Sequence, residues 1–160
     1  MNAEPLERVP SFVVAQIGSR RIALQSSGIA ELILSPLLHT FPHTTSLIVG
    51  VVLRRGRVLP VLDMGLGLLG IPSAAAKFYL VIERHIGNIA DRYAIPVDGE
   101  CELVSGIMFP PKDEDGFAIG SLDLAGDVID VIDFEKAIAR SLIVKSENVR
   151  TNVETTEALQ

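Results

Sequence analysis

The glycines between Gly65 and Gly70 are the first feature of this sequence that could do chemistry, because GLGLLG has the GxGxxG spacing of a dinucleotide-binding turn. Such a site needs a helix that begins in the glycine turn and crosses over to a parallel strand, which takes about a dozen residues. Only six residues separate Gly70 from Lys77, and Pro72 is one of them. The spacing therefore favours a short helical turn followed by a surface linker. A small nucleotide-binding enzyme that uses this turn is kept as the alternative function from another class.

Histidine and acidic side chains are the second candidates, since they can bind metal ions. His39 and His43 have the four-residue spacing of ligands on one helix, but Pro42 would break that helix. The run from Lys112 to Gly116, KDEDG, is similar to part of an EF-hand loop, yet Leu122 stands where the closing Glu is required. We predict no metal site in either stretch.

The remaining reactive residue types have simpler explanations. Asp127, Asp130 and Asp133 recur every three residues, which on a strand places them on different faces, so solvation, turn and capping roles account for them. Cys101, the single cysteine, cannot form an internal disulfide and lies between two glutamates in an otherwise apolar run, which favours a small core residue. No GxSxG or similar nucleophile context occurs. The sequence therefore predicts no catalytic residue and no bound cofactor.

The stretch that organises the chain is 50–64, GVVLRRGRVLPVLDM. Two apolar runs flank a short basic segment, a spacing typical of two strands joined by a tight turn. Gly56 can adopt the positive φ that such a turn often needs. Pro60 cannot donate to a sheet ladder, which predicts a sheet edge or a bulge on one side of the second strand. Asp63 can cap the start of a short helix.

Composition narrows the class of protein. The 160 residues are 48% hydrophobic, with no tryptophan, thirteen glycines and nine prolines, which favours one domain, or two small subdomains sharing an aliphatic core, built from many short strands. The net charge of −6 argues against nucleic acid as a partner. No apolar stretch approaches the roughly 20 residues of a spanning helix, so we expect no direct membrane insertion. Glutamates at the N-terminus, where a signal peptide would be basic, indicate a cytoplasmic protein.

The rest of the chain repeats the pattern of short apolar runs and turns. A helix from Phe134 to about Val144 is predicted after Asp133, which can cap it. Residues 35–46 are predicted to be a surface loop, and 1–10 and 145–160 polar tails, so the folded domain runs from 11 to 144. We find no internal repeat. Further strands are predicted at 12–17, 21–24, 77–83, 90–97, 101–104, 117–124 and 128–132.

The 50–64 stretch resembles the CheW-like domain of bacterial chemosensory systems, whose signature has Gly-Val, an Asn-Leu-Arg-Gly turn and a strand that carries Pro and ends on Asp. Leu53 and Arg54 depart from this signature, since they stand where the family usually has Asn and Leu. Residues 29–32 resemble the family's Val-x-Glu-Ile element, and 94–104 resembles its second signature. The positions that match the first signature in place are Gly50, Val51, Arg55, Gly56, Pro60 and Asp63.

This resemblance implies an all-β fold with a short C-terminal helix, in which two small five-stranded SH3-like barrels pack side by side. It also implies a non-catalytic adaptor that couples the cytoplasmic tip of chemoreceptors to the regulatory domain of the CheA histidine kinase. The receptor is expected in the apolar groove between the barrels, and the kinase at the end of one barrel. The alternatives within this class are a scaffold of a type IV pilus or other non-flagellar pathway, and a scaffold that has lost receptor binding.

Five residues match family positions tied to receptor or kinase coupling: Ile29, Glu31, Gly50, Arg55 and Gly56. Glu31 and Arg55 are expected to form an ion pair that joins two strand elements. Two roles stay open for this pair, since it could hold the fold near the groove or contact a partner directly. Loss of binding without loss of stability on replacing Arg55 would favour contact.

Overall fold

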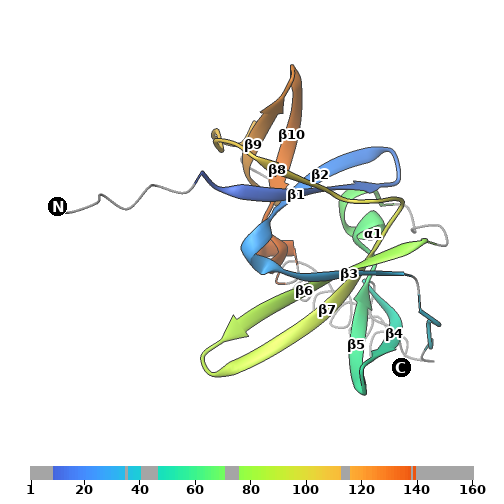
Figure 1. Cartoon of the computed structure of the whole chain (residues 1–160). Helices are drawn as coiled ribbons and strands as arrows, with labels where there is room; N and C mark the ends of the chain where they lie inside the picture. The colour runs from blue at the N-terminus through green and yellow to red at the C-terminus, as the bar shows by residue number, and fades with distance from the viewer. Residues whose placement is uncertain are drawn as a thin grey trace, which may run out of the picture.

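The computed structural model describes residues 9–34, 36–40, 47–70, 76–112, 116–137 and 139. In these ranges the chain is mostly short strands, as expected from its glycines, prolines and β-branched runs (Figure 1). Two helices are short: η1 (Ser26–Gly28), a 3-10 turn, and α1 (Met64–Leu69). The strands are β1 (Ser11–Ile17), β2 (Arg20–Gln25), β3 (Ile29–Leu34), β4 (Ile48–Arg54), β5 (Arg57–Leu62), β6 (Phe78–Ile86), β7 (Ile89–Val97), β8 (Glu102–Ser105), β9 (Ala118–Leu124) and β10 (Asp127–Ile132).

The strands form two five-stranded sheets, which confirms the expected two-part β fold. Barrel 1 has the order β8-β1-β2-β10-β9 and lies at the top of Figure 1, and barrel 2 has the order β3-β6-β7-β5-β4 and lies below it. In both barrels one pair of neighbouring strands is parallel and the other pairs are antiparallel. The parallel pair is β10 with β2 in barrel 1 and β5 with β7 in barrel 2. The two barrels therefore share one topology.

Each sheet closes because the chain that leaves one edge strand returns to the opposite edge. After β3, His39 exchanges backbone hydrogen bonds with Val51 of β4, with N···O distances of 2.8 and 2.9 Å. After β8, Phe109 does the same with Ser121 of β9, at 2.8 and 2.9 Å. These bonds satisfy backbone groups that an open edge would expose to other chains.

The barrels are also structural repeats, which corrects the expectation that the chain contains no internal repeat. The β9–β10 hairpin repeats the β4–β5 hairpin, and each hairpin leads into an aspartate and a helical segment. The closing bridges at His39 and Phe109 are equivalent as well. In every case the second residue number exceeds the first by 70, as in Gly50 and Gly120, Arg55 and Ala125, Gly56 and Gly126, and Asp63 and Asp133.

A shared apolar core joins the two barrels. Ile22 of β2, Leu80 of β6 and Ile95 of β7 are almost fully buried in it. Met64 at the start of α1 and Phe134 after β10 fill the space between the sheets, where α1 is visible in Figure 1. Each barrel has a smaller core of its own as well. Burial of the two helix starts explains why a capped helical turn follows each hairpin.

Local predictions from the sequence hold where the structure describes them. The Asp63 carboxylate accepts a hydrogen bond from the Leu66 backbone N–H at 3.2 Å and caps α1. The Asp133 carboxylate accepts from the backbone N–H groups of Glu135 and Lys136, at 2.9 and 3.4 Å, and 134–137 is helical. The predicted end of that helix near Val144, the tails 1–8 and 145–160, and the linker 71–75 lie outside the described residues.

The sheet-edge position that was one of two predicted for Pro60 is wrong. Its strand, β5, is not at the edge of the sheet, because it lies between β7 and β4. On the β4 side Pro60 faces Val51 in a nearly continuous ladder, whereas on the β7 side the register contains the single pair Val61 and Ala94. Proline is tolerated because the ladder is incomplete on one side of the strand.

Candidate docking surfaces

A hollow of about 310 Å³ lies between the two barrels, and we call it the groove. Ile29, Ile82 and Phe134 give it apolar walls drawn from both barrels. Arg84 and Glu135 add charge, and Ser27 of η1 forms part of its exposed rim. A mixed lining of this kind suits an amphipathic protein surface better than a small apolar ligand. Ile29 is the one predicted site residue that lies there.

The charge of Arg84 in the groove is held by two neighbouring side chains. Its Nη2 donates to Asp91 Oδ2 at 3.3 Å and to the Tyr93 hydroxyl at 3.2 Å, and its guanidinium lies 5.5 Å from the centre of the Tyr93 ring. The Nε atom is buried and has no hydrogen-bond partner among the described residues. Because buried donors are nearly always satisfied, this unmet N–H is a local cost to the stability of the fold.

The end of the β4–β5 hairpin is a second candidate surface, which we call the basic end. Arg54, Arg55 and Arg57 surround the turn, and Arg55 and Gly56 have positive φ values of 50° and 75°. Leu53 and Val58 face each other across the two strands and are 56% and 59% exposed. Exposed apolar side chains beside arginines are typical of the centre of a protein interface.

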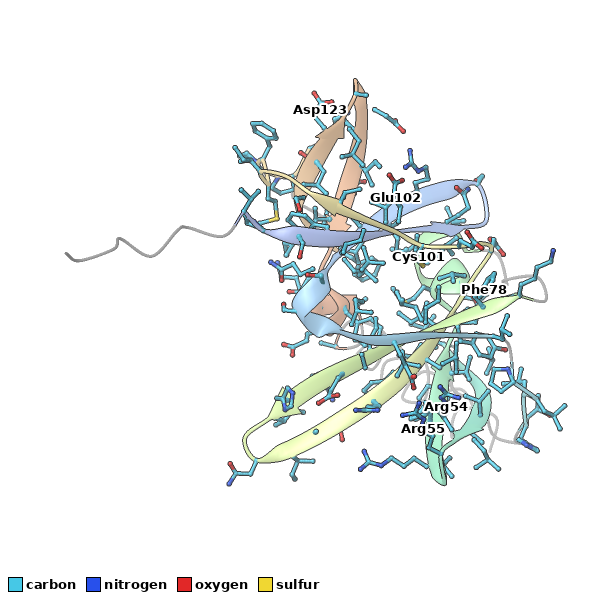
Figure 2. All side chains as sticks on the ribbon, in the orientation of Figure 1. Arg54, Arg55, Phe78, Cys101, Glu102 and Asp123 are labelled. Carbon is cyan, nitrogen blue, oxygen red and sulfur yellow. The ribbon has the colours of Figure 1, made fainter. Side chains whose placement is uncertain are left out.

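The ion pair at this end differs from the expected one, since Glu31 pairs with Arg54 and not with Arg55. Arg54 Nε and Nη2 donate to the two carboxylate oxygens of Glu31 at 3.1 and 3.0 Å, the two-bond geometry that suits a guanidinium. The pair joins β3 to β4, the two edge strands that meet when barrel 2 closes. The structural role proposed for this pair therefore falls to Arg54, and Arg55 follows it in the turn and is labelled beside it in Figure 2.

The hydrogen bonds from Arg54 hold the pKa of the Glu31 carboxyl below its usual value, and the charges of Arg54, Arg55 and Arg92 lower it further against an opposing effect of burial. A lowered pKa in the folded state means that the ionised carboxyl stabilises the fold above the pKa of the unfolded chain. This contribution is lost as the pH falls through the folded-state pKa.

We expect Glu31→Gln to lower the thermal midpoint at neutral pH and to lose this effect in acid, well below the usual Glu pKa of 4.5. Thermal melts of parent and variant across this pH range check the prediction. Glu102→Gln is the control, because its carboxylate is 66% exposed and lies 3.7 Å from Arg21. An equal difference between parent and Glu31→Gln at every pH would contradict the assignment.

Gly50 and Gly56 have structural roles, because the backbone at each position requires glycine. A Cβ at Gly50 would collide with the backbone oxygen of His39, so the closing bridge of barrel 2 needs glycine there. Gly56 has open space around it and is required by its φ alone. The five predicted residues thus fall into three places: Ile29 in the groove, Glu31, Arg55 and Gly56 at the basic end, and Gly50 under the bridge.

Other candidate residues have structural roles. The GxGxxG residues form the last five residues of α1 and its left-handed C-cap at Gly70, and the following strand, β6, pairs antiparallel with β3 and β7. The parallel crossover that a dinucleotide site needs is therefore not formed there. Cys101 is half-buried against the shared core, and burial raises the pKa of its thiol. His43 and residues 113–115 lie outside the described residues.

The capping role predicted for Asp133 is confirmed, whereas Asp127 and Asp130 form ion pairs that were not predicted. Asp127 pairs with Arg21 at 2.9 Å, Asp130 pairs with Arg20 at 2.7 Å, and Asp133 caps a helix. None of the described helices is long and apolar enough to cross a membrane.

The fold defines a class: a β protein of two similar five-stranded barrels, with two candidate docking surfaces. Residues 11–105, more than half of the chain, match the family model described as CheW-like domain, and the chain belongs to that family. Family members are non-catalytic scaffolds and adaptors of chemotaxis signalling. No curated protein matches the sequence significantly.

Among solved structures, the chain is similar to the crystal structure of scaffolding protein TtCheW from Thermoanaerobacter tengcongensis. The match has a TM-score of 0.68 and covers 84% of this chain and 90% of that one. Sequence identity is 18%, so this likeness concerns the fold. It extends beyond the segment that the family model matches.

Proposed function

We propose that this chain is a cytoplasmic adaptor that couples the cytoplasmic tip of a chemoreceptor to the regulatory domain of a CheA histidine kinase. The observation that carries the proposal is the presence of two docking surfaces with separate residues. The groove is lined by both barrels, and the basic end belongs to barrel 2 alone. Two partners can therefore bind one adaptor without competing for the same side chains.

The receptor is assigned to the groove and the kinase to the basic end. Chemoreceptor tips are helical, and an amphipathic helix buries its apolar face in a groove with apolar walls and a polar rim. Ile29 contributes such a wall, while Arg84 and Glu135 can meet polar residues of the helix. The hairpin end offers the exposed side chains of Leu53 and Val58 to a flat partner surface.

A three-component assembly test examines the proposal as a whole. Receptor fragment, CheA kinase and this protein are combined, and kinase activity and co-sedimentation are measured. We expect both to rise only when all three are present. The absence of stimulation and of co-sedimentation with every receptor and kinase pair from the same cell would overturn the adaptor assignment. A nucleotide-dependent rise in the melting temperature of this protein alone would support the enzyme alternative instead.

Ser27→Arg is expected to block the groove without loosening the fold. Ser27 is exposed on the groove rim, so a long charged side chain there adds bulk and buries nothing. The affinity for the receptor fragment, measured by co-sedimentation, should fall at least about tenfold, which is equivalent to about 1.4 kcal/mol. Ser19→Arg in the exposed β1–β2 turn is the matched control and should bind receptor like the parent. Equal binding by both variants would exclude the groove as the receptor surface.

A further inference from the structure

In barrel 2 the parallel strands β5 and β7 touch at one point and then separate. Their register contains the single pair Val61 and Ala94, and in the described ranges no ion pair or side-chain hydrogen bond joins 57–60 to 89–93. Figure 1 shows the β6–β7 hairpin extending to the lower left and the β4–β5 hairpin to the bottom. A hollow of about 440 Å³, lined by 57–60 and 90–93, lies between the diverging strands. We call this hollow the cleft.

The equivalent contact of barrel 1, between β2 and β10, is bridged by charged side chains. Arg20 pairs with Asp130 at 2.7 Å, and Arg21 pairs with Asp127 at 2.9 Å. In barrel 2 the repeat positions of these two aspartates hold a proline and an arginine, which cannot accept from a guanidinium. In addition, β7 begins further ahead of its parallel contact than β2 does. Barrel 2 therefore keeps a cleft that barrel 1 bridges.

Backbone groups of β7 point into the cleft. In the β6–β7 hairpin, Ile86 and Ile89 face each other beside a two-residue turn, and such a pair is hydrogen-bonded. Hydrogen-bonded and non-hydrogen-bonded pairs alternate along antiparallel strands, so Ala90 and Arg92 direct their N–H and C=O groups away from β6. A strand edge with free backbone groups is a template for another extended segment. This edge therefore favours a strand of polypeptide over a compact ligand.

The two faces of the cleft differ in their side chains. Because the strands are in register at their contact, alternate residues of β5 and of β7 share a face. Arg57 and Arg92 lie on one face, which is basic. The other face is lined by Val58, Pro60, Asp91 and Tyr93. A strand that entered the cleft would meet charge on one of its faces and mainly apolar groups on the other.

The charges of the cleft favour an acidic occupant. Arg92 is 2.9 Å from Glu83, and Asp91 is 3.3 Å from Arg84, so these four side chains neutralise one another in pairs. Arg57 is exposed and has no ion pair among the described residues. The unbalanced charge of the cleft is therefore positive, and a carboxylate beside Arg57 would complement it.

We propose that the cleft binds an extended segment of a partner protein in which acidic and apolar residues alternate, added antiparallel to β7. The backbone of this segment bonds to Ala90 and Arg92, its acidic side chains face Arg57, and its apolar side chains face Val58 and Pro60. Antiparallel pairing is chosen because it is the more stable arrangement per residue. The lining of the cleft shares no residue with the groove, and the proposal does not depend on the proposed function.

Two synthetic peptides of about six residues, a typical strand length, test the side-chain pattern. One alternates Glu with Val and the other alternates Lys with Val. Fluorescence anisotropy of each labelled peptide, titrated with the full chain, measures Kd. We expect the Glu peptide to bind with a Kd below about 1 mM and the Lys peptide at least about tenfold more weakly. Absence of binding by the Glu peptide, or equal binding of both peptides, would overturn the proposal.

Ala90→Pro tests the backbone edge, because it removes one N–H that points into the cleft. Residue 90 belongs to a non-hydrogen-bonded pair with β6, so the hairpin should tolerate proline and keep its thermal midpoint within about 4 °C. The Kd of the Glu peptide should rise at least about tenfold. Ala90→Val keeps the N–H and suits a strand, so it is the matched control and should bind like the parent. Equal Kd values for Ala90→Pro and Ala90→Val would exclude strand addition at this edge.

Arg57→Glu tests the charge without changing β7. The Glu peptide should bind at least about tenfold more weakly to this variant, and the Lys peptide should become the preferred one. Lys136→Glu makes the same change in net charge at an exposed position outside the cleft and should leave both Kd values unchanged. An Arg57→Glu variant that kept the preference for the Glu peptide would overturn the proposal. Amide hydrogen exchange at Ala90 and Arg92 should slow when the Glu peptide binds, and unchanged exchange there would place the peptide elsewhere and refute the cleft.

Discussion

Gly50→Ala is expected to lower the stability of this protein more than any other exchange of one glycine for alanine in the described chain. The new Cβ would meet the backbone oxygen of His39, which cannot move without breaking the two hydrogen bonds that close barrel 2. Overpacking in a rigid site costs about 1–3 kcal/mol and sometimes more. For a chain of this size each kcal/mol corresponds to a shift of roughly 2–4 °C in the thermal midpoint.

Gly120→Ala tests the same closure in barrel 1. Its Cβ would press against the side chain of Met108 and lie 2.8 Å from the backbone oxygen of Phe109. Because a methionine side chain can shift whereas a bridging backbone cannot, we expect a smaller loss than at Gly50. Thermal melts of both variants compare the two closures directly.

Gly28→Ala and Gly99→Ala are the matched controls for these two variants. A Cβ at either position would meet no heavy atom within 4 Å, and neither glycine has a positive φ. Both should melt close to the parent. If Gly50→Ala also melted like the parent, the bridge would not be a closing contact, and the resemblance of Gly50 to a coupling position would need a functional explanation.

Local chemistry explains which features were predictable from the sequence. The hairpin follows from Gly56 in a basic turn, because a tight turn needs its positive φ. The two helix caps follow from Asp63 and Asp133, because each carboxylate bonds a backbone N–H a few residues along the chain. The family signature then added the arrangement of two barrels, which no local pattern contains. Ile29, which lines the groove, was selected because it belongs to a signature element.

The ion pair and the repeat were missed for different reasons. Arg54 and Arg55 are adjacent, and only the folded hairpin shows that Arg55 lies in the turn while Arg54 lies on the strand that meets Glu31. The repeat is hidden because the equivalent positions keep the backbone shape and invert the charge, as in Arg57 and Asp127. Matching glycines and aspartates 70 residues apart were the available signal.

Arg55→Ala should leave the thermal midpoint within about 2 °C of the parent and yet remove most of the affinity for the kinase regulatory domain. Stability is preserved because Ala125 has a φ of 53° at the equivalent position, where Arg55 has 50°, so the turn accepts alanine. The Glu31 pair is preserved too, since it is made by Arg54. An arginine at the centre of an interface contributes about 2 kcal/mol or more, roughly 30-fold in Kd.

Arg54→Ala is the comparison variant for Arg55→Ala. It removes the ion pair with Glu31 that joins β3 to β4, so it should lower the thermal midpoint, whereas Arg55→Ala should not. Three measurements distinguish the roles of the two arginines: isothermal titration with the kinase regulatory domain, pull-down with the receptor fragment, and thermal melts. Loss of kinase affinity with receptor binding intact in Arg55→Ala would support contact at the basic end. Unfolding of Arg55→Ala would show that this arginine holds the fold, and unchanged kinase affinity would move the kinase surface elsewhere on the barrels.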